Sequence, residues 1–317
     1  MKIKTFCDVF KKRYKLPEIK NLDDILIYFK KLKESINRGD VSALIIVDYL
    51  YNNISSKRVR KRKSSATEFE DFLDYAFGGK VTDNETRKNI SPNLLIDISQ
   101  AIHNYISSNR REKMDILFPS GYGLSLKTSV PDNTEINLGS FAREALFEGF
   151  LTPQEYGGER KGGLGSKPQI ELTLNKIKAK GQWSNFYKRF AIMVENIYVD
   201  DIIFVIKDDY KLQIYGISGA TLRKIIIEAV EEGPKSAITV INRYEGNSIR
   251  VERDKIIQKG AKVEIDFSKI EHSNLKKIIL HLEELEEGAL IYLDKNDIRG
   301  CEKFLLNKTK EIINSMK

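Results

Sequence analysis

The sequence has few of the residues on which several common protein chemistries depend. Of its 317 residues, 2 are cysteine and 3 are histidine. Cys7 and Cys301 stand far apart and form neither a CxxC motif nor a disulfide framework, which disfavours a thiolate zinc site and redox chemistry. The histidines, at positions 103, 272 and 281, do not cluster, so a histidine-based nuclease and a zincin are disfavoured as well.

Long apolar runs are also missing. The run at residues 43–47 is far shorter than the about 20 apolar residues of a membrane-spanning helix, and residues 1–5 lack the apolar stretch of a secretory signal. With 41% hydrophobic residues, 15 Phe and 14 Tyr, the composition is too apolar for a disordered chain. We therefore expect a cytoplasmic globular protein of one large or two medium domains.

The chain is basic, and its positive charge is concentrated in two segments. Lysine and arginine number 53 against 45 acidic residues (53 − 45 = +8). Residues 57–63 carry six positive charges, and residues 157–190 carry eight against two negative ones (8 − 2 = +6). Such clusters favour contacts with phosphate groups, although a charge run is otherwise ordinary solvated surface. The residues of these segments predicted to contact DNA are Lys57, Arg58, Arg60, Lys61, Arg62, Lys63, Arg160, Lys161, Lys167, Lys176, Lys178 and Lys180. Arg143, between the segments, is a further candidate, with pairing to a carboxylate on its own helix as the alternative.

Helical periodicity dominates the first third of the chain. Apolar residues recur at helical spacing through residues 1–55, and again at 65–77 after a cluster of capping residues. A further helix is predicted at 92–107, where Pro92 suits a first helical turn.

The pattern then changes to strands. Residues 114–118 and 122–128 flank a Pro-Ser-Gly turn and predict an antiparallel hairpin. Residues 137–150 return to a helical pattern. The remaining predictions are helices at 169–180, 184–198 and 220–231, strands at 201–207, 211–217, 236–242, 248–252 and 262–267, and two C-terminal helices.

This order of elements predicts a mixed α/β fold, in which a central mixed sheet is flanked by helices. Three regions are expected along the chain. They are a helical N-terminal region at 1–56, a core with a basic segment at 57–232, and a β/α region at 233–317.

The predicted hairpin brings together residues able to do chemistry. Side chains alternate along a strand, so Ser125 and Lys127 share a face, and the pairing can bring Asp115 beside them. A carboxylate, the Leu126 carbonyl and a lysine then converge. Oxygen ligands suit Mg²⁺, and an ammonium group can stabilise the charge that develops on a phosphodiester during hydrolysis.

On these residues, the region 57–231 resembles the PD-(D/E)xK nuclease superfamily, and more narrowly type II restriction endonucleases. It has a helix carrying glutamates, an acidic strand, an x-x-K strand, a helix, and then further strands and a helix. The resemblance implies that Asp115 is the metal-binding aspartate and Lys127 the family lysine. Glu70 matches the acidic residue of the first core helix, with Glu68 as the alternative.

Two positions depart from the family pattern. Met114 stands where the family often has proline, and Ser125 replaces the second acid, which removes a metal ligand. Some restriction enzymes with an SxK strand take the missing carboxylate from the following helix. Glu144 and Glu148 are the candidates here, with Glu144 preferred. The resemblance thus implies a metal site of Asp115, the Leu126 carbonyl and Glu144.

The function implied is Mg²⁺-dependent, site-specific cleavage of double-stranded DNA to 5′-phosphate and 3′-hydroxyl ends. A homodimer and a cognate DNA methyltransferase are implied as partners. Two alternatives remain open: a non-catalytic DNA- or RNA-binding protein, and a structure-specific nuclease of the same superfamily. The glycine-rich segment 157–167 lacks the GK[ST] ending of a P-loop. It is interpreted as a flexible basic loop that contacts phosphates, with a plain surface loop as the alternative.

Overall fold

The structure is a computed structural model, and it describes residues 3–38, 40–54, 65–82, 114–141, 143–157, 164–245 and 248–268. Several predicted features lie outside these residues. They are the basic run 57–63, the helix at 92–107, Arg160 with Lys161, and the C-terminal helices.

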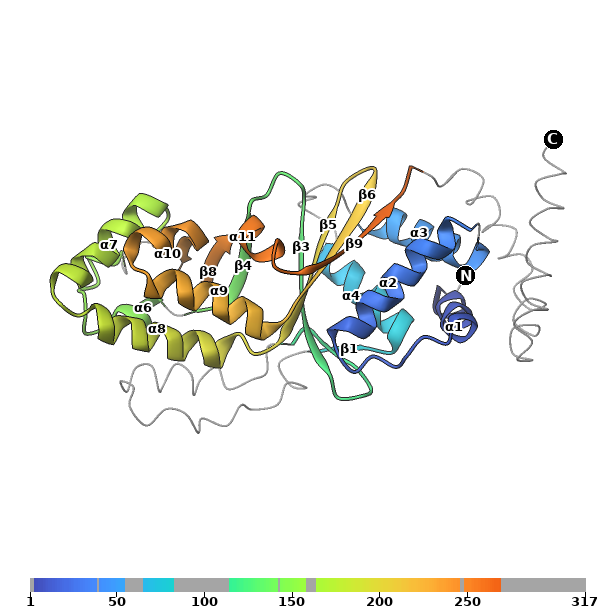
Figure 1. Cartoon of the computed structure of the whole chain (residues 1–317), viewed down its shortest axis with the longest axis horizontal. Coiled ribbons are helices and arrows are strands. Elements are labelled where there is room, and N and C mark those ends of the chain that lie inside the picture. The colour runs from blue at the N-terminus through green and yellow to red at the C-terminus, as the bar shows by residue number, and fades with distance from the viewer. Residues whose placement is uncertain are drawn as a thin grey trace, which may run out of the picture.

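A six-stranded mixed sheet forms the centre of the described molecule (Figure 1). Its strand order is β1-β2-β3-β5-β6-β9. The bounds are Lys80–Val81 for β1, Ile116–Leu117 for β2, Gly123–Ser129 for β3, Asp201–Lys207 for β5, Lys211–Ile217 for β6 and Ala261–Asp266 for β9. β3 and β5 run parallel, and every other neighbouring pair in this sheet is antiparallel.

A smaller antiparallel sheet lies beside the central one. It has the order β4-β8-β7, with β4 at Glu135–Ser140, β8 at Ser248–Glu252 and β7 at Ile241–Glu245. β4 follows β3 directly in the chain. The small sheet therefore begins where the predicted active strand ends.

Four N-terminal helices pack against one face of the central sheet. They are α1 at Ile3–Tyr14, α2 at Leu22–Ile36, α3 at Val41–Asn53 and α4 at Ser65–Phe77. Their aromatic side chains, such as Phe29 and Phe72, form one core cluster with Leu126, Ile203 and Ile214 of the sheet. Because side chains alternate along a strand, the residues between these point to the other face.

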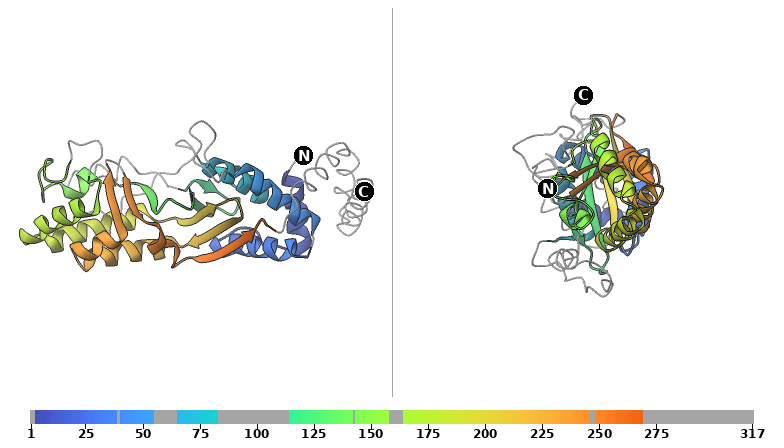
Figure 2. Two further views of the ribbon diagram at one scale, coloured as in Figure 1. Left: turned by 90° about the horizontal axis from the view of Figure 1, so that it is seen from above. Right: turned by 90° about the vertical axis from the view of Figure 1, so that its left-hand side faces the viewer.

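The other face of the central sheet shares a second core with the small sheet and six helices (Figures 1 and 2). This core joins Phe204 and Ile206 of β5 to Phe141, Phe190 and Tyr244. The helices are α6 at Arg143–Phe147, α7 at Lys167–Ala179, α8 at Trp183–Ile197, α9 at Gly219–Glu231, α10 at Pro234–Val240 and α11 at Arg253–Ile257. The small sheet and α6–α10 form a lobe at the end of the molecule opposite the N-terminal helices.

Most of the sequence pattern is confirmed. The helices within 1–55 and at 65–77, the hairpin of β2 and β3, and the strands at 201–207 and 211–217 form as predicted. So do the helices near 169–180, 184–198 and 220–231 and the strands near 248–252 and 262–267. The prediction of a mixed sheet flanked by helices is confirmed at this level.

Two predicted elements are wrong. The helix expected at 137–150 is a strand at Glu135–Ser140 followed by the short helix α6. Ile136 and Leu138 are buried alternately, and Gly139 has a positive φ of 64° at a bulge opposite β8. The strand expected at 236–242 begins instead at Ile241, because Gly233 and Pro234 start the helix α10 before it.

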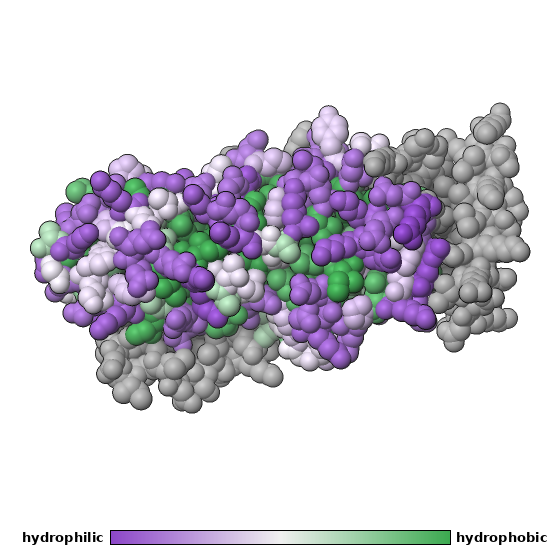
Figure 3. Space-filling view, in the orientation of Figure 1, coloured by the Kyte–Doolittle hydropathy of each residue, from purple (hydrophilic) through white to green (hydrophobic). Residues whose placement is uncertain are grey.

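The surface seen in Figure 3 is mainly hydrophilic, and polar side chains separate the apolar ones that show between them. None of the helices within the described ranges combines the length and the apolar character that crossing a membrane requires.

The C-terminal end of α3 is attached to the sheet by a buried lysine. Lys207, at the end of β5, is 6% exposed and donates to the carbonyls of Tyr51 (2.6 Å) and Ile54. Carbonyls at the end of a helix have no partner within the helix, so this ammonium supplies one. Burial lowers the pKa of Lys207 from its usual range.

We expect Lys207→Met to lower the free energy of unfolding by about 1–3 kcal/mol, because both carbonyls lose their donor. Urea denaturation measures this change. Lys224→Met, at an exposed lysine of α9, is the control and should stay within about 0.5 kcal/mol of the parent protein. A stabilised Lys207→Met variant would mean that the cost of burying the charge exceeds the value of its hydrogen bonds.

Candidate active site

Asp115 lies directly before β2, where the pairing of β2 with β3 ends. Its backbone N–H donates to the Leu124 carbonyl (2.8 Å), which continues the hairpin by one bond. Its carboxylate oxygen Oδ2 accepts a hydrogen bond from the Leu126 N–H (2.7 Å) and lies 3.5 Å from the Lys127 ammonium. The Asp115 carboxylate thus accepts the Leu126 N–H beyond the point where the paired residues of β2 and β3 end.

Tight packing fixes this end of the hairpin. A Cβ at Gly123 would lie 2.5 Å from the Sδ and 3.1 Å from the Cβ of Met114, so it fits there only if the Met114 side chain moves. From the β1 side, the Thr82 hydroxyl donates to the Met114 carbonyl, and the Thr82 N–H donates to the Asp115 carbonyl (2.9 Å). Met114 is therefore held from both sides.

Ser125 and Lys127 share the face of β3 that looks toward the second core. In the parallel register with β5 they lie opposite Ile202 and Phe204, which belong to that core. Leu126 points to the other face, but its backbone groups lie in the plane of the sheet. Because the N–H and carbonyl of a strand residue face the same neighbour, the Leu126 carbonyl lies on the same edge as the N–H that Asp115 accepts.

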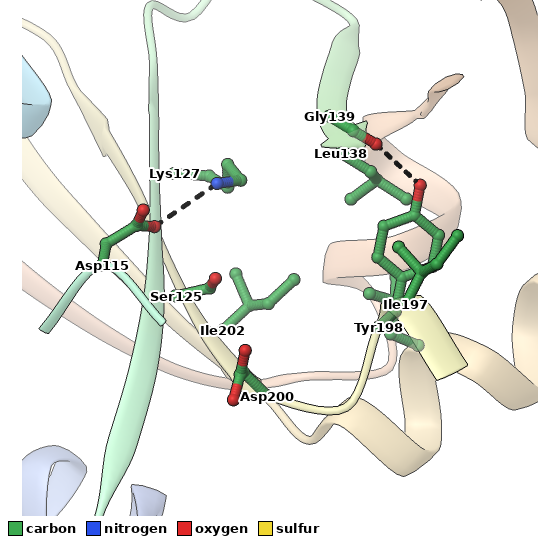
Figure 4. Close-up of a pocket in the computed structure, with 10 residues that line it drawn as sticks. Asp115, Ser125, Lys127, Leu138, Gly139, Ile197, Tyr198, Asp200 and Ile202 are labelled. Carbon is green, nitrogen blue, oxygen red and sulfur yellow. Dashed lines mark hydrogen bonds and ion pairs between the residues drawn. The ribbon is translucent and has the colours of Figure 1, made fainter. Parts of the chain in front are cut away.

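Asp115, Ser125 and Lys127 open onto a pocket (Figure 4). The opposite wall is formed by Leu138 and Gly139 of β4 and by Tyr198, which follows α8. The pocket therefore lies between the central sheet and the lobe. The sequence prediction that the first three residues meet at one place agrees with this geometry.

A further carboxylate, from Asp200, lines the same pocket and was missed by the sequence reasoning. Asp200 lies in the corner between α8 and β5, and Figure 4 shows its carboxylate directed toward Ser125. A signal was present in the sequence. An acidic pair, Asp200-Asp201, immediately precedes the apolar run of the strand that pairs with the x-x-K strand.

The corner that carries Asp200 is held by several interactions. Arg223 donates to the Tyr198 carbonyl (2.8 Å), and the Tyr198 hydroxyl donates to the Gly139 carbonyl (3.0 Å). Asp201 accepts the Gly219 N–H (2.9 Å) and the Tyr122 hydroxyl (2.7 Å). Burial and the Asp201 carboxylate both raise the pKa of Tyr122, so this hydroxyl keeps its proton and remains a donor.

The helix glutamates expected to complete the site lie elsewhere. Glu144 is in α6, half exposed, and pairs with Arg143 (2.7 Å). Glu148 follows α6 and is exposed, and neither residue lines the pocket. The expectation for Glu144 is corrected because β4 takes up the first half of the predicted helix and so changes where the following residues lie.

Glu68 and Glu70 belong to α4, which packs on the opposite face of the central sheet through Phe69 and Phe72. Glu68 is close enough to Lys207, at the far end of β5, to raise its pKa in opposition to burial. The expectation that Glu70 or Glu68 joins Asp115 and Lys127 is therefore not met in this structure.

The predicted DNA-contacting residues have different surroundings. Arg143 is 2% exposed and lies over the Tyr156 ring, so its assignment to a DNA-contacting surface is corrected. Lys167 pairs with Glu252 (3.0 Å) and Lys180 with Glu155 (3.4 Å). Lys176 and Lys178 are exposed on α7.

A hard divalent cation is the metal that this pocket suits. Among the described residues, no group of three or more His, Cys, Asp and Glu side chains is arranged to hold a metal ion. The pocket offers the two carboxylates of Asp115 and Asp200. Mg²⁺ is commonly bound by one or two carboxylates, with water and substrate phosphate as the remaining ligands.

Comparison of the chain with protein-family models, with curated proteins and with solved structures finds no match. The site is therefore argued from its own geometry.

Gly219 is the position at which the corner is most easily disturbed. A Cβ there would lie 2.8 Å from the Asp200 carbonyl and closer to that of Val199. We expect Gly219→Ala to displace this backbone and lower the free energy of unfolding by about 1–3 kcal/mol, measured by urea denaturation. Ala220→Ser changes an exposed neighbour by one atom and should have no measurable effect. Equal stability of both variants would contradict the tight packing.

Proposed function

We propose that this protein is a Mg²⁺-dependent endonuclease that hydrolyses phosphodiester bonds of double-stranded DNA. One observation carries the proposal. The Asp115 carboxylate, the Lys127 ammonium 3.5 Å from it and the backbone of Leu126 meet at one edge of the sheet, beside a pocket. An anion-stabilising cation beside a metal-binding carboxylate suits attack on a phosphodiester.

Each residue has a role in this mechanism. Asp115 and the Leu126 carbonyl would hold Mg²⁺, which when bound polarises the phosphate and lowers the pKa of a bound water. Lys127 stabilises negative charge on the phosphate oxygens or orients the attacking water. Attack in line with the departing 3′ oxygen leaves 5′-phosphate and 3′-hydroxyl ends.

The topology supports the same proposal. The helix α4, the hairpin of β2 and β3, a crossover that contains β4 and α6–α8, and the parallel strand β5 follow one another along the chain. The helix, the hairpin and the later strand agree with the order on which the resemblance to type II restriction endonucleases rests, whereas β1 and β4 were not part of that order. Site specificity, a homodimer that cuts both strands, a companion methyltransferase and a cytoplasmic location go with this proposal.

A non-catalytic nucleic-acid-binding protein is the second candidate. It is favoured by the exposed lysines of α7, Lys176 and Lys178, which could contact phosphates without the pocket. This candidate needs neither Asp115 nor Lys127, so the two proposals predict different results for variants of the pocket.

The test is incubation of the protein with phage DNA and Mg²⁺, followed by gel electrophoresis. We expect discrete fragments that disappear with EDTA, and a rate lowered by about 100-fold or more in Lys127→Ala, because the charge on the phosphate loses its stabilising ammonium. Lys235→Ala, at an exposed lysine of α10, is the matched control and should cut at the parental rate.

A gel shift without cleavage, across several divalent metals and DNAs, would leave the binding protein as the function. Nicking of branched DNA without a fixed fragment pattern would instead indicate a structure-specific nuclease. Cleavage that is unchanged in Lys127→Ala would refute the assigned site.

A further inference from the structure

We infer that Asp200 is the second acidic residue of this active site and supplies the carboxylate that Ser125 lacks. The inference deepens the proposed function and rests on it for the reaction. Asp200 would bind the same divalent cation as Asp115, either directly or through a metal-bound water, since Mg²⁺ keeps several waters in protein sites.

The sheet register and the lining of the pocket place Asp200 near Ser125. Ser125 pairs with Ile202 across β3 and β5, and both line the pocket. Asp200 stands two residues before Ile202, in the bend directly before β5, and lines the same pocket as Ser125 and Ile202. In Figure 4, Ser125 lies between the two aspartates, with Asp115 on one side and Asp200 on the other.

The adjacent residue, Asp201, has a structural role that differs from the place of Asp200 in the pocket wall. Asp201 uses one carboxylate oxygen for the Gly219 N–H and the other for the Tyr122 hydroxyl. These bonds join the start of β5 to α9 and to the hairpin. Asp201 thus supports the corner, while its neighbour Asp200 lines the pocket.

The charges that line the pocket add up to a site for a cation and a phosphodiester. Asp115, Asp200 and Lys127 are the charged residues of its lining, with a sum of −1 (1 − 2). A divalent cation brings the sum to +1, and the single negative charge of a phosphodiester then neutralises it. Asp115 and Lys127 alone sum to zero and would leave one positive charge uncompensated in that complex.

Binding of Mn²⁺, measured by electron paramagnetic resonance of the free ion, tests the inference without requiring activity. We expect Asp200→Asn to raise the Mn²⁺ Kd by about 10–100-fold, as Asp115→Asn should, and to move the Mg²⁺ dependence of cleavage to higher concentration. Glu195→Gln removes an exposed carboxylate from α8 and is the matched control, with the parental Kd. Glu144→Gln should also keep it.

Three results would overturn the inference. They are a parental protein that does not bind Mn²⁺, an Asp200→Asn variant with the parental Kd and cleavage rate, and a large fall in Tm for this nearly isosteric variant, which would indicate a role in folding. Mn²⁺ binding that depends on Asp200 in a protein that cuts no DNA would support the metal site and refute only the proposed reaction.

Discussion

The parallel pairing of β3 with β5 is the constraint on which the rest of the structure depends. It aligns Ser125 with Ile202 and Lys127 with Phe204, so the polar face of β3 continues into the second core. A parallel pair needs a long crossover, and here the crossover contains β4 and α6–α8. Any sequence in this fold that kept the hairpin but lost this pairing would separate Asp115 from Asp200.

The two hydrophobic cores lie on opposite faces of the central sheet, and the two faces differ in polarity. The face toward α1–α4 is filled with aromatic and aliphatic side chains, among which Leu126 is buried. The face toward the lobe is apolar along β5 and polar at Asp115, Ser125 and Lys127. One strand can therefore anchor a core and present charged groups at once, since its side chains alternate.

The sequence allowed the hairpin, and with it Asp115 and Lys127, to be predicted, because turn residues and two-residue alternation are local signals. The strands of residues 201–207 and 211–217 were equally clear from their apolar runs. The helix at 137–150 was wrong because Leu138 and Phe141 fit a helical period, while the pairing with β8 that makes the segment a strand comes from residues more than a hundred positions later.

Asp200 was missed for a similar reason, although the acidic pair Asp200-Asp201 precedes a clear strand. Asp200 and Asp115 line the same pocket only because particular strands become neighbours, and the order of strands is a property of the whole sheet. A search for the missing acid in the next helix led to Glu144, which instead pairs with the buried Arg143. Local patterns identified the residues of single elements, but not the combination of elements that forms the pocket wall.

The chain leaves the central sheet after Ser129, two residues beyond Lys127, and returns to it at Asp201, directly after Asp200. Between these points it forms β4 and α6–α8. Both ends of this excursion are at the pocket. Two of the connections between the lobe and the central sheet therefore adjoin charged residues of the pocket, Lys127 and Asp200, whereas the connections from β6 to α9 and from α11 to β9 carry none of its charged groups. The packing of the lobe against the sheet thus holds the two walls of the pocket in place.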